Sequence, residues 1–180
     1  MKAHGPWQIV ASRQVYSDPW IEVARDEVIR PDGQPGSHCT VRMKAGVCVL
    51  PLDVDGQVWL TEEFHYAIGR VGLEGVSGGI EVGEDVDITA RRELREELGF
   101  EAARWTRLGT LDPFTSIVLS PTALYLAEDL RPVLRAPEGT ELIRPVRLPL
   151  AEAIRLMDTG QITHGPTCVL LLQALRRATL

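Results

Sequence analysis

Apolar and polar residues alternate along the first part of the chain in a way that predicts strands. Residues 7–16 and 20–30 both follow this pattern, and residues 17–19 form the turn between them. Residues 38–43 are expected to return as a third strand. A sheet of this size has little core of its own, so residues 1–43 are predicted to form a small antiparallel N-terminal unit that needs a partner surface.

The longer remainder, residues 44–180, mixes strands with helices. The continuous apolar run 47–52 predicts a strand buried on both faces, and residues 57–64 return beside it. Strands, a central helix, strands and terminal helices in this order favour a sheet between helices, that is, an α/β domain. The other predicted segments are a loop or irregular strand at 65–75, strands at 105–111, 122–127 and 141–148, a segment that is loop-like at both ends at 112–121, an exposed loop at 131–140, and helices at 150–157 and 166–177.

Residues 85–98 carry the pattern of an amphipathic helix. Asp85 suits its N-cap and Gly99 its C-terminal end. An apolar residue recurs at every fourth position, which gives the helix one stripe that faces a core. The residues of this stripe are Val86, Ala90, Leu94 and Leu98.

Acidic residues beside this stripe carry the most informative chemistry of the sequence. Glu93 and Glu97 lie one helical turn apart, next to Glu96. Like charges at this spacing destabilise a helix by about 0.2–0.5 kcal/mol unless something neutralises them. A hard dication such as Mg²⁺ would do so, because it binds few carboxylates and keeps water and phosphate oxygens as its other ligands. The alternative is a solvated face on which these glutamates pair with the arginines of the helix.

Composition and charge narrow the class of protein. The 180 residues suit one domain with a sizeable core, and 44% hydrophobic and 24% charged residues are ordinary for a soluble globular protein. A net charge of −6 argues against a nucleic-acid partner. The three cysteines are far apart, which fits a reducing compartment. With no signal-peptide pattern and no apolar run of membrane-spanning length, a cytoplasmic protein without a membrane partner is expected.

The spacing around the helix resembles the Nudix box in full. Gly78 is followed after five residues by Glu84 and after seven more by residues 92–100, RELREELGF. This matches G-x5-E-x7-R-E-U-x-E-E-x-G-U, where U is a bulky apolar residue. The resemblance implies an α/β/α sandwich, here with the small antiparallel sheet at its N-terminus. It also implies Mg²⁺-dependent hydrolysis, with Mn²⁺ as a substitute, of a nucleoside diphosphate linked to another moiety.

The resemblance also implies roles within the box. Glu93 and Glu97 match the main metal ligands of the family, and Glu96 is the third candidate. Arg92 lies one turn before Glu96 and is expected to hold that carboxylate in place; an ordinary surface cation is the alternative. Glu84 is expected to stabilise the geometry of the loop and the helix.

The sequence before the box resembles one subfamily, the ADP-ribose pyrophosphatases. Residues 74–81, EGVSGGIE, are similar to its E-L-P-A-G-x-x-E segment. In that subfamily the residue at the position of Ser77 gives a backbone carbonyl to the metal. The subfamily also implies a homodimer in which the N-terminal sheets exchange and an aromatic residue stacks on the nucleobase. Trp20 matches the neighbourhood of that residue, and a buried strand tryptophan is the alternative.

One departure from the subfamily concerns substrate binding. An arginine that grips phosphate is common where this chain has His65, so His65 puts that grip in doubt and Arg70 is the substitute candidate. Glu74 completes the expected substrate-binding set.

A second departure concerns the catalytic base. The segment 112–121 is longer than the usual turn, so the base is expected elsewhere. Glu141, with Glu138 as second choice, matches the region of a mobile glutamate in related enzymes. The alternative is that both are solvent-exposed and that metal-bound hydroxide, with Glu96 nearby, suffices.

The expected reaction is hydrolysis of the pyrophosphate of a nucleoside diphosphate sugar. ADP-ribose, cleaved to AMP and ribose 5-phosphate, is the leading substrate. GDP-mannose, NADH or a dinucleoside polyphosphate are alternatives, because the box residues touch only the diphosphate. A non-catalytic nucleotide-sugar sensor is the alternative from another class, which a broken box would favour.

Overall fold

The structure is a computed structural model that describes residues 1–135 and 142–178. Its chain divides into two compact units. The smaller unit holds Met1–Lys44 and Asp112–Pro121, and the larger holds Ala45–Leu111 and Thr122–Leu180. Each unit is described separately below. Among the helices described, none combines the length and the hydrophobicity that a membrane crossing requires.

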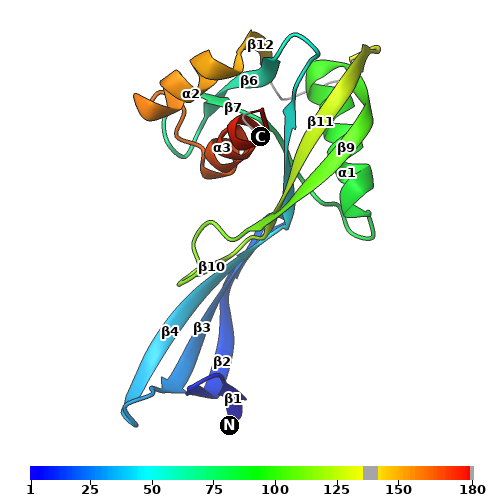
Figure 1. Ribbon diagram of the computed structural model, residues 1–180. Coiled ribbons are helices and arrows are strands. Elements are labelled where there is room, and N and C mark those ends of the chain that lie inside the picture. Colours follow the sequence, from blue (N-terminus) through cyan, green and yellow to red (C-terminus); the bar gives the residue numbers. More distant parts are fainter. Residues whose placement is uncertain (136–141, 179–180) are drawn as a thin grey trace. The chain divides into compact units, whose positions relative to one another are not determined.

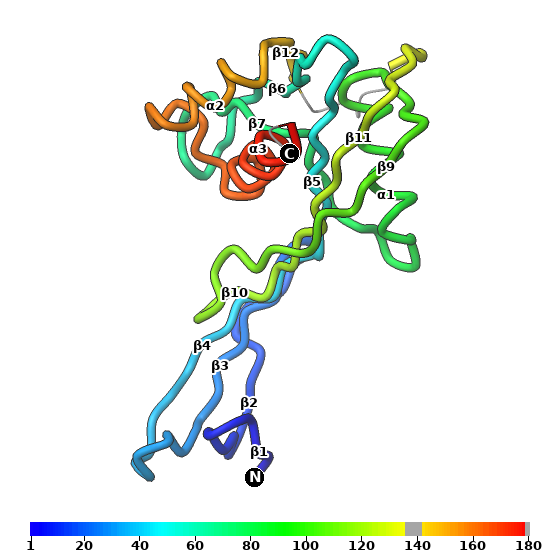
Figure 2. The backbone as a smooth tube through the Cα atoms, in the orientation of Figure 1, coloured from blue at the N-terminus to red at the C-terminus, as the bar shows by residue number. Residues whose placement is uncertain are grey.

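The smaller unit is a long sheet in which neighbours in sequence pair antiparallel and a short strand is added in parallel. The predicted hairpin is confirmed, and its turn is held by the Asp18 carboxylate, which accepts hydrogen bonds from the N–H groups of Trp20 and Ile21 at 2.8 Å each. Figure 2 shows these strands side by side. In order across the sheet they are β1 (Lys2–His4), β2 (Trp7–Ser17), β3 (Ile21–Ile29), β4 (Pro35–Met43) and β10 (Val118–Leu119).

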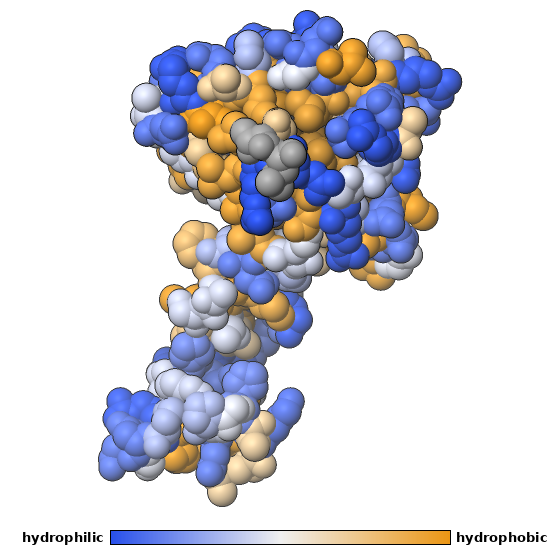
Figure 3. Space-filling view, in the orientation of Figure 1, coloured by the Kyte–Doolittle hydropathy of each residue, from blue (hydrophilic) through white to orange (hydrophobic). Residues whose placement is uncertain are grey.

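Hydrophobic side chains of the smaller unit are mostly at its surface. Of the residues in this unit, all of which the structure describes, Val28 is the one buried hydrophobic residue. Figure 3 shows hydrophobic residues among hydrophilic ones on the surface of this sheet. The prediction that the N-terminal sheet has little core of its own is therefore confirmed. Its exposed large hydrophobic residues include Val10, Val15, Tyr16, Trp20, Met43, Phe114, Ile117 and Leu119.

The larger unit contains two sheets and their covering helices. One sheet has the order β8-β5-β11-β9, with β11 parallel to β5, and the other has the order β12-β6-β7. The strands are β5 (Gly46–Pro51), β6 (Gln57–His65), β7 (Arg70–Glu74), β8 (Val76–Gly79), β9 (Phe100–Leu111), β11 (Thr122–Pro132) and β12 (Arg144–Pro149). The helices are α1 (Val86–Glu93), η1 (Leu94–Leu98), α2 (Leu150–Asp158) and α3 (Gly165–Ala178).

Strand β5 lies between two hydrophobic cores, as its continuous apolar run predicted. Cys48 and Leu50 belong to the core that α2 and α3 cover, whereas Val47 and Val49 belong to the core that α1 covers. Because neighbouring side chains of a strand point to opposite faces, both faces of β5 are buried. Figure 1 shows α1 on one side of this sheet and α2 and α3 on the other. The expected α/β/α sandwich is confirmed.

The central helix begins and ends where the sequence predicts. The Asp85 side chain accepts hydrogen bonds from the N–H groups of Asp87 and Ile88, and Gly99 has the left-handed φ of 69° that favours glycine. The last turn, Leu94–Leu98, is wound as a π-helix, which the sequence pattern does not predict. Single π turns are rare and occur often at functional sites.

Strands β9 and β11 are longer than predicted. β9 begins at Phe100 rather than at residue 105, and β11 continues to Pro132, beyond the predicted end at residue 127. Their outer parts pair with each other, and an ion pair between the strands joins Arg104 to Glu128 at 3.2 Å. Backbone pairing and charge pairs need no apolar alternation, so the hydrophobic pattern missed these ends. β12 begins at Arg144; the predicted strand began at residue 141, which lies outside the described residues.

Candidate active site

Two buried carboxylates and the first glycine of the box form the centre of the candidate site. Glu93 is 9% exposed and Glu97 is 5% exposed, although both are acidic. A Cβ atom on Gly78 would lie 1.9 Å from Oε1 of Glu93, so the Glu93 carboxylate fills the space that any other residue at position 78 would need. Glycine at position 78 therefore lets the Glu93 side chain occupy this position.

The guanidinium of Arg92 connects the acidic residues around this centre. Its Nε and Nη2 donate to the Glu84 carboxylate at 2.9 and 3.1 Å, and its Nη1 donates to Glu96 Oε2 at 2.8 Å and lies 2.8 Å from Glu93 Oε1. Nη2 also donates to the Gly79 carbonyl at 3.2 Å. The hydrogen bonds from Arg92 lower the pKa of Glu84 to about 2. Arg92 is therefore a half-buried clamp that joins the loop before the helix to the helix itself.

Glu97 faces the strand before the box. The N–H of Ser77 lies 3.4 Å from Glu97 Oε1, and the Ser77 hydroxyl donates to the Gly75 carbonyl at 2.9 Å. The same hydroxyl contacts Sγ of Cys48 at 3.3 Å. Burial raises the pKa of the Cys48 thiol to about 12, so this sulfur is a neutral packing group rather than a nucleophile.

The chemistry of these donors fits a hard dication. Among residues 1–135 and 142–178, no three His, Cys, Asp or Glu side chains form a ready metal cluster. Mg²⁺ does not need one, because it is usually bound by one or two carboxylates and keeps several waters. Glu93 and Glu97 supply two such buried oxygen donors, and Arg92 contacts both Glu93 and the more exposed Glu96. A closed zinc site, with its four protein ligands, is a poorer match.

Glu74 lies between two histidines. His65 Nε2 is 2.8 Å from Glu74 Oε1, without the alignment of a hydrogen bond, and His164 Nδ1 is 3.3 Å from Glu74 Oε2. Burial raises the pKa of Glu74, and burial lowers the pKa of His164 to about 4. Arg70 donates from Nη2 to the Thr163 hydroxyl at 2.8 Å. The structure thus brings His65 and Glu74 together, and it adds His164, which no local sequence pattern indicated.

Three further residues were predicted for the site: Trp20, Glu138 and Glu141. Trp20 belongs to the smaller unit and is 68% exposed, so the alternative of a buried strand tryptophan is wrong. Glu138 and Glu141, the candidates for the catalytic base, lie outside the described residues.

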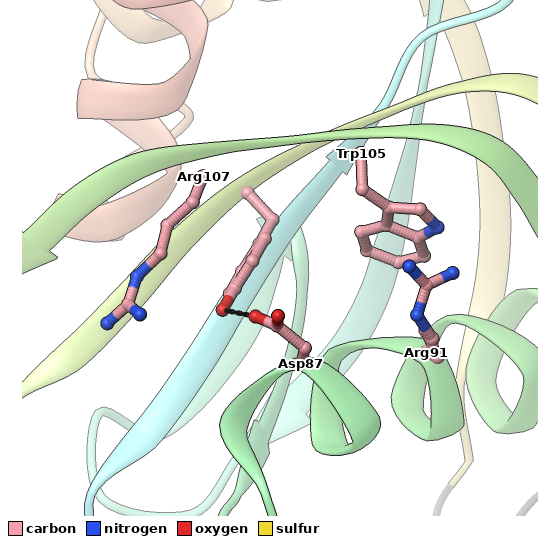
Figure 4. A pocket seen from close by; sticks show the side chains of 5 residues that line it. Asp87, Arg91, Trp105 and Arg107 are labelled. Atoms are coloured by element: carbon pink, nitrogen blue, oxygen red, sulfur yellow. Dashed lines mark hydrogen bonds between the residues drawn. The ribbon is translucent and has the colours of Figure 1, made fainter.

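A separate cavity of about 160 Å³ lies between α1 and the strands β9 and β11, and none of the box glutamates lines it. In Figure 4, Asp87 accepts a hydrogen bond from the buried Tyr125 hydroxyl, and Arg91 lies over the Trp105 ring at 4.8 Å from its centroid. Burial, together with the Asp87 carboxylate, raises the pKa of Tyr125 to about 12. The polar groups of Asp87, Tyr125 and Arg91 thus have partners within the cavity wall. Arg107 is the remaining residue that lines the cavity.

Comparisons with known proteins agree with this geometry. The model of the NUDIX domain matches residues 42–166, and the model of the nucleoside diphosphate sugar hydrolase N-terminal domain matches residues 7–41. The α/β/α sandwich and the box helix with its two buried carboxylates fit the NUDIX match. The chain belongs to the Nudix family and is a Nudix hydrolase. Enzymes of this family generally use divalent metal cations.

Relatives match over most of the chain. An ADP-ribose pyrophosphatase of Mycobacterium tuberculosis is 29% identical over 167 residues, which cover 91% of this chain and 80% of the relative. An ADP-ribose pyrophosphatase of Bacillus subtilis is 24% identical over 160 residues, which cover 88% and 86%. A crystal structure of an ADP compounds hydrolase superposes with a TM-score of 0.83 at 24% identity and covers 99% of this chain and 96% of that one. This last likeness concerns the fold.

Proposed function

We propose that this protein hydrolyses the pyrophosphate of a nucleoside diphosphate sugar in a Mg²⁺-dependent reaction, with ADP-ribose cleaved to AMP and ribose 5-phosphate. The observation that carries the proposal is a pair of buried carboxylates: Glu93, which packs against Gly78, and Glu97, which faces the Ser77 N–H. Buried charges of like sign are unfavourable unless a cation or hydrogen-bond donors compensate them. The two relatives named ADP-ribose pyrophosphatase support the choice of substrate.

The residues of the box would hold the metal and keep its ligands in place. Glu93 and Glu97 would bind it through carboxylate oxygens, together with the backbone carbonyl of Ser77 and with Glu96 as a further ligand. When bound, the metal supplies neutralisation of the diphosphate charge and an activated water. Arg92 keeps the carboxylates of Glu93 and Glu96 oriented, because its Nη1 lies 2.8 Å from both. Mn²⁺ is expected to replace Mg²⁺, since both prefer carboxylate and water ligands.

The base that takes a proton from the attacking water is proposed to be Glu141, with Glu138 as second choice. In sequence both lie between the end of β11 at Pro132 and the start of β12 at Arg144. A carboxylate contributed by a loop can reach the water when substrate closes the site. If neither is needed, Glu96 is the remaining carboxylate near the metal.

The substrate is proposed to contact Arg70, His65, Glu74 and Trp20. Arg70 is exposed and donates from Nη2 to the Thr163 hydroxyl, and the other N–H groups of its guanidinium can donate to phosphate. His65 Nε2 contacts Glu74, so the substrate is proposed to meet His65 together with that carboxylate, while Arg70 binds the phosphate. Trp20 offers an exposed ring on which a nucleobase can stack.

A homodimer is part of the proposal. The smaller unit exposes many large hydrophobic residues and buries almost none, and such a sheet gains stability from a partner surface. A second copy of the chain, with exchanged N-terminal sheets, would supply that surface and bring Trp20 to a neighbouring site. Sedimentation at micromolar protein concentration tests this, and a monomer there would remove the role of Trp20 across subunits.

The experiment that tests the reaction is a hydrolysis screen with Mg²⁺ on ADP-ribose, ADP-glucose, GDP-mannose, UDP-glucose, NADH and diadenosine tetraphosphate, with products separated by chromatography. ADP-ribose is expected to be the preferred substrate. Glu97→Gln should lose nearly all turnover, and the matched control Glu152→Gln, an exposed glutamate of α2 paired with Arg155, should keep it. A profile led by GDP-mannose would keep the Nudix reaction and discard ADP-ribose. No turnover of any substrate by the parent would favour a sensor.

A further inference from the structure

The chain changes from one sheet to the other at a single peptide group just before the candidate metal site. Strand β7 ends at Glu74 in the sheet with β6, and β8 begins at Val76 in the sheet with β5. Gly75 belongs to neither strand. A Cβ atom on Gly75 would lie 2.9 Å from the Val49 carbonyl oxygen, so the backbone passes here in close contact with β5.

Two buried threonine hydroxyls hold the two ends of that peptide group. Thr61 Oγ1, on β6, donates to the Glu74 carbonyl at 3.2 Å, and the Gly75 N–H donates to Thr167 Oγ1, on α3, at 2.8 Å. Thr61 is 5% exposed and Thr167 is fully buried. The carbonyl of Glu74 and the N–H of Gly75 belong to the same planar peptide, so the two bonds fix its orientation from opposite sides. A valine at either position would fill the same volume but could make neither bond.

The clamped peptide connects directly to Ser77 and Glu97. The Gly75 carbonyl accepts from the Ser77 hydroxyl at 2.9 Å, and the Ser77 N–H faces Glu97 Oε1 at 3.4 Å. Rotation of the peptide between Glu74 and Gly75 would therefore move the backbone of residues 75–77. It would also move the donor that orients Glu97.

We infer that Thr167 and Thr61 are positioning residues for the metal site, which act by fixing the peptide that precedes Ser77. The inference rests on the proposed function, since it takes Ser77 and Glu97 as metal ligands. Groups that orient metal ligands typically change metal affinity by about 10–100-fold when they are removed. The shorter bond is made by Thr167, so its loss has the larger effect. Thr167 Oγ1 is itself 2.8 Å from Nδ1 of His164, the residue just before α3, and this contact supports the orientation of the hydroxyl.

The experiment measures Mn²⁺ binding to the full chain without substrate, by the electron paramagnetic resonance signal of free Mn²⁺. We expect Thr167→Val to weaken Mn²⁺ binding about tenfold, Thr61→Val to weaken it less, and Thr167→Ser, which keeps the hydroxyl, to bind like the parent. Thr159→Val is the matched control, because the hydroxyl of Thr159 bonds to carbonyls of α2 and to the side chain of Gln161. It should bind Mn²⁺ like the parent. Thermal unfolding of each variant shows whether the fold is retained.

The outcomes separate the inference from the function on which it rests. If Glu97→Gln loses Mn²⁺ binding while folded Thr167→Val and Thr61→Val bind it like the parent, the positioning role is overturned and the metal site stands. If Glu97→Gln itself binds Mn²⁺ like the parent, the proposed metal site is wrong. Should Thr167→Val fail to fold, the other two variants decide. Weaker Mn²⁺ binding by folded Thr61→Val, with parent-like binding by Thr167→Ser, supports the clamp. Parent-like binding by Thr61→Val overturns it.

Discussion

The two units of the chain differ in how they use their hydrophobic residues. In the larger unit, β5 is buried on both faces and two cores contain most of the buried side chains. In the smaller unit, Val28 is the one buried hydrophobic residue, while Trp20, Val15 and other apolar side chains are at the surface. Dense packing can fix the positions of catalytic groups to fractions of an ångström. An exposed sheet cannot do this, and it is suited to contact with another molecule or another copy of the chain.

The largest effect is expected where packing and chemistry meet, at Gly78. Replacing Gly78 with alanine places a Cβ 1.9 Å from Glu93 Oε1, so the carboxylate must leave its position. Misplacement of a reacting group by about 1 Å costs about 10²-fold in rate, and kcat for ADP-ribose should fall by at least that factor. Steady-state kinetics at saturating Mg²⁺ measure it.

Gly165→Ala is the control for Gly78→Ala. Gly165 has no atom within 4 Å of the added Cβ and no positive φ, so this variant should keep the parent's kcat. Equal kcat for Gly78→Ala and the parent would contradict the view that close packing positions Glu93.

The second prediction compares the same substitution in the two units. Val58 on β6 is fully buried, whereas Val15 on β2 is 48% exposed. Val58→Ala removes two buried methyl groups and should lower the free energy of unfolding by about 2 kcal/mol. Val15→Ala should change it by less than about 0.5 kcal/mol in the monomer. Urea denaturation at low protein concentration measures both.

Protein concentration extends this comparison. If Val15 contacts a second copy, the cost of Val15→Ala should grow as the protein concentration rises, because dimer formation stabilises the folded chain by mass action. Equal costs for Val58→Ala and Val15→Ala at low concentration would contradict the difference between the two units.

Sequence reasoning succeeded where local spacing determines structure and failed where contacts join distant segments. Asp85, Gly99 and the box residues could be placed because helix caps and the four-residue repeat depend on neighbours in sequence. The prediction of a buried β5 followed from its apolar run. The role of each carboxylate in the site still depends on metal binding, which the Mn²⁺ experiments address.

The contacts that sequence reasoning missed have no local signature. Thr167 meets Gly75 across 92 positions of the chain, and His164 reaches Glu74 in the same way. The outer halves of β9 and β11 are held by pairing with each other. Their polar residues carry no apolar alternation, so the sequence pattern did not predict these parts as strands. A threonine in an apolar helix or a glycine between strands is too common to predict such a partner.

A third prediction asks whether the smaller unit serves binding. Trp20→Ala should raise KM for ADP-ribose about tenfold, because stacking of a base on an aromatic ring contributes about 1–3 kcal/mol. The melting temperature should not change, since the ring is exposed. Trp20→Phe keeps a stacking surface and should show a smaller increase in KM. An unchanged KM for Trp20→Ala would assign the nucleobase to another group.

The smallest effect is expected at Glu84, whose ion pair with Arg92 joins the loop to the helix. The folded pKa of Glu84, about 2, lies below its usual value of 4.5. A lowered carboxylate pKa stabilises the folded chain above pH 4.5, and this contribution is lost as the pH falls from 4.5 toward 2. Because the pair is partly exposed to solvent, Glu84→Gln should cost only about 1 kcal/mol at pH 7.

Urea denaturation of the parent and of Glu84→Gln at pH 7, 5, 4 and 3 tests the sign as well as the size of this effect. The difference between the two proteins should be constant at pH 7 and 5 and should shrink at pH 4 and 3, because the parent then loses the stabilisation that the variant never had. Glu152→Gln removes a glutamate whose ion pair with Arg155 is exposed, so it should change stability little at any of these values. If the difference for Glu84→Gln instead stays constant down to pH 3, the Glu84 side chain acts through its shape and hydrogen bonding. The negative charge of Glu84 beside Arg92 is then not needed to join the loop to the helix.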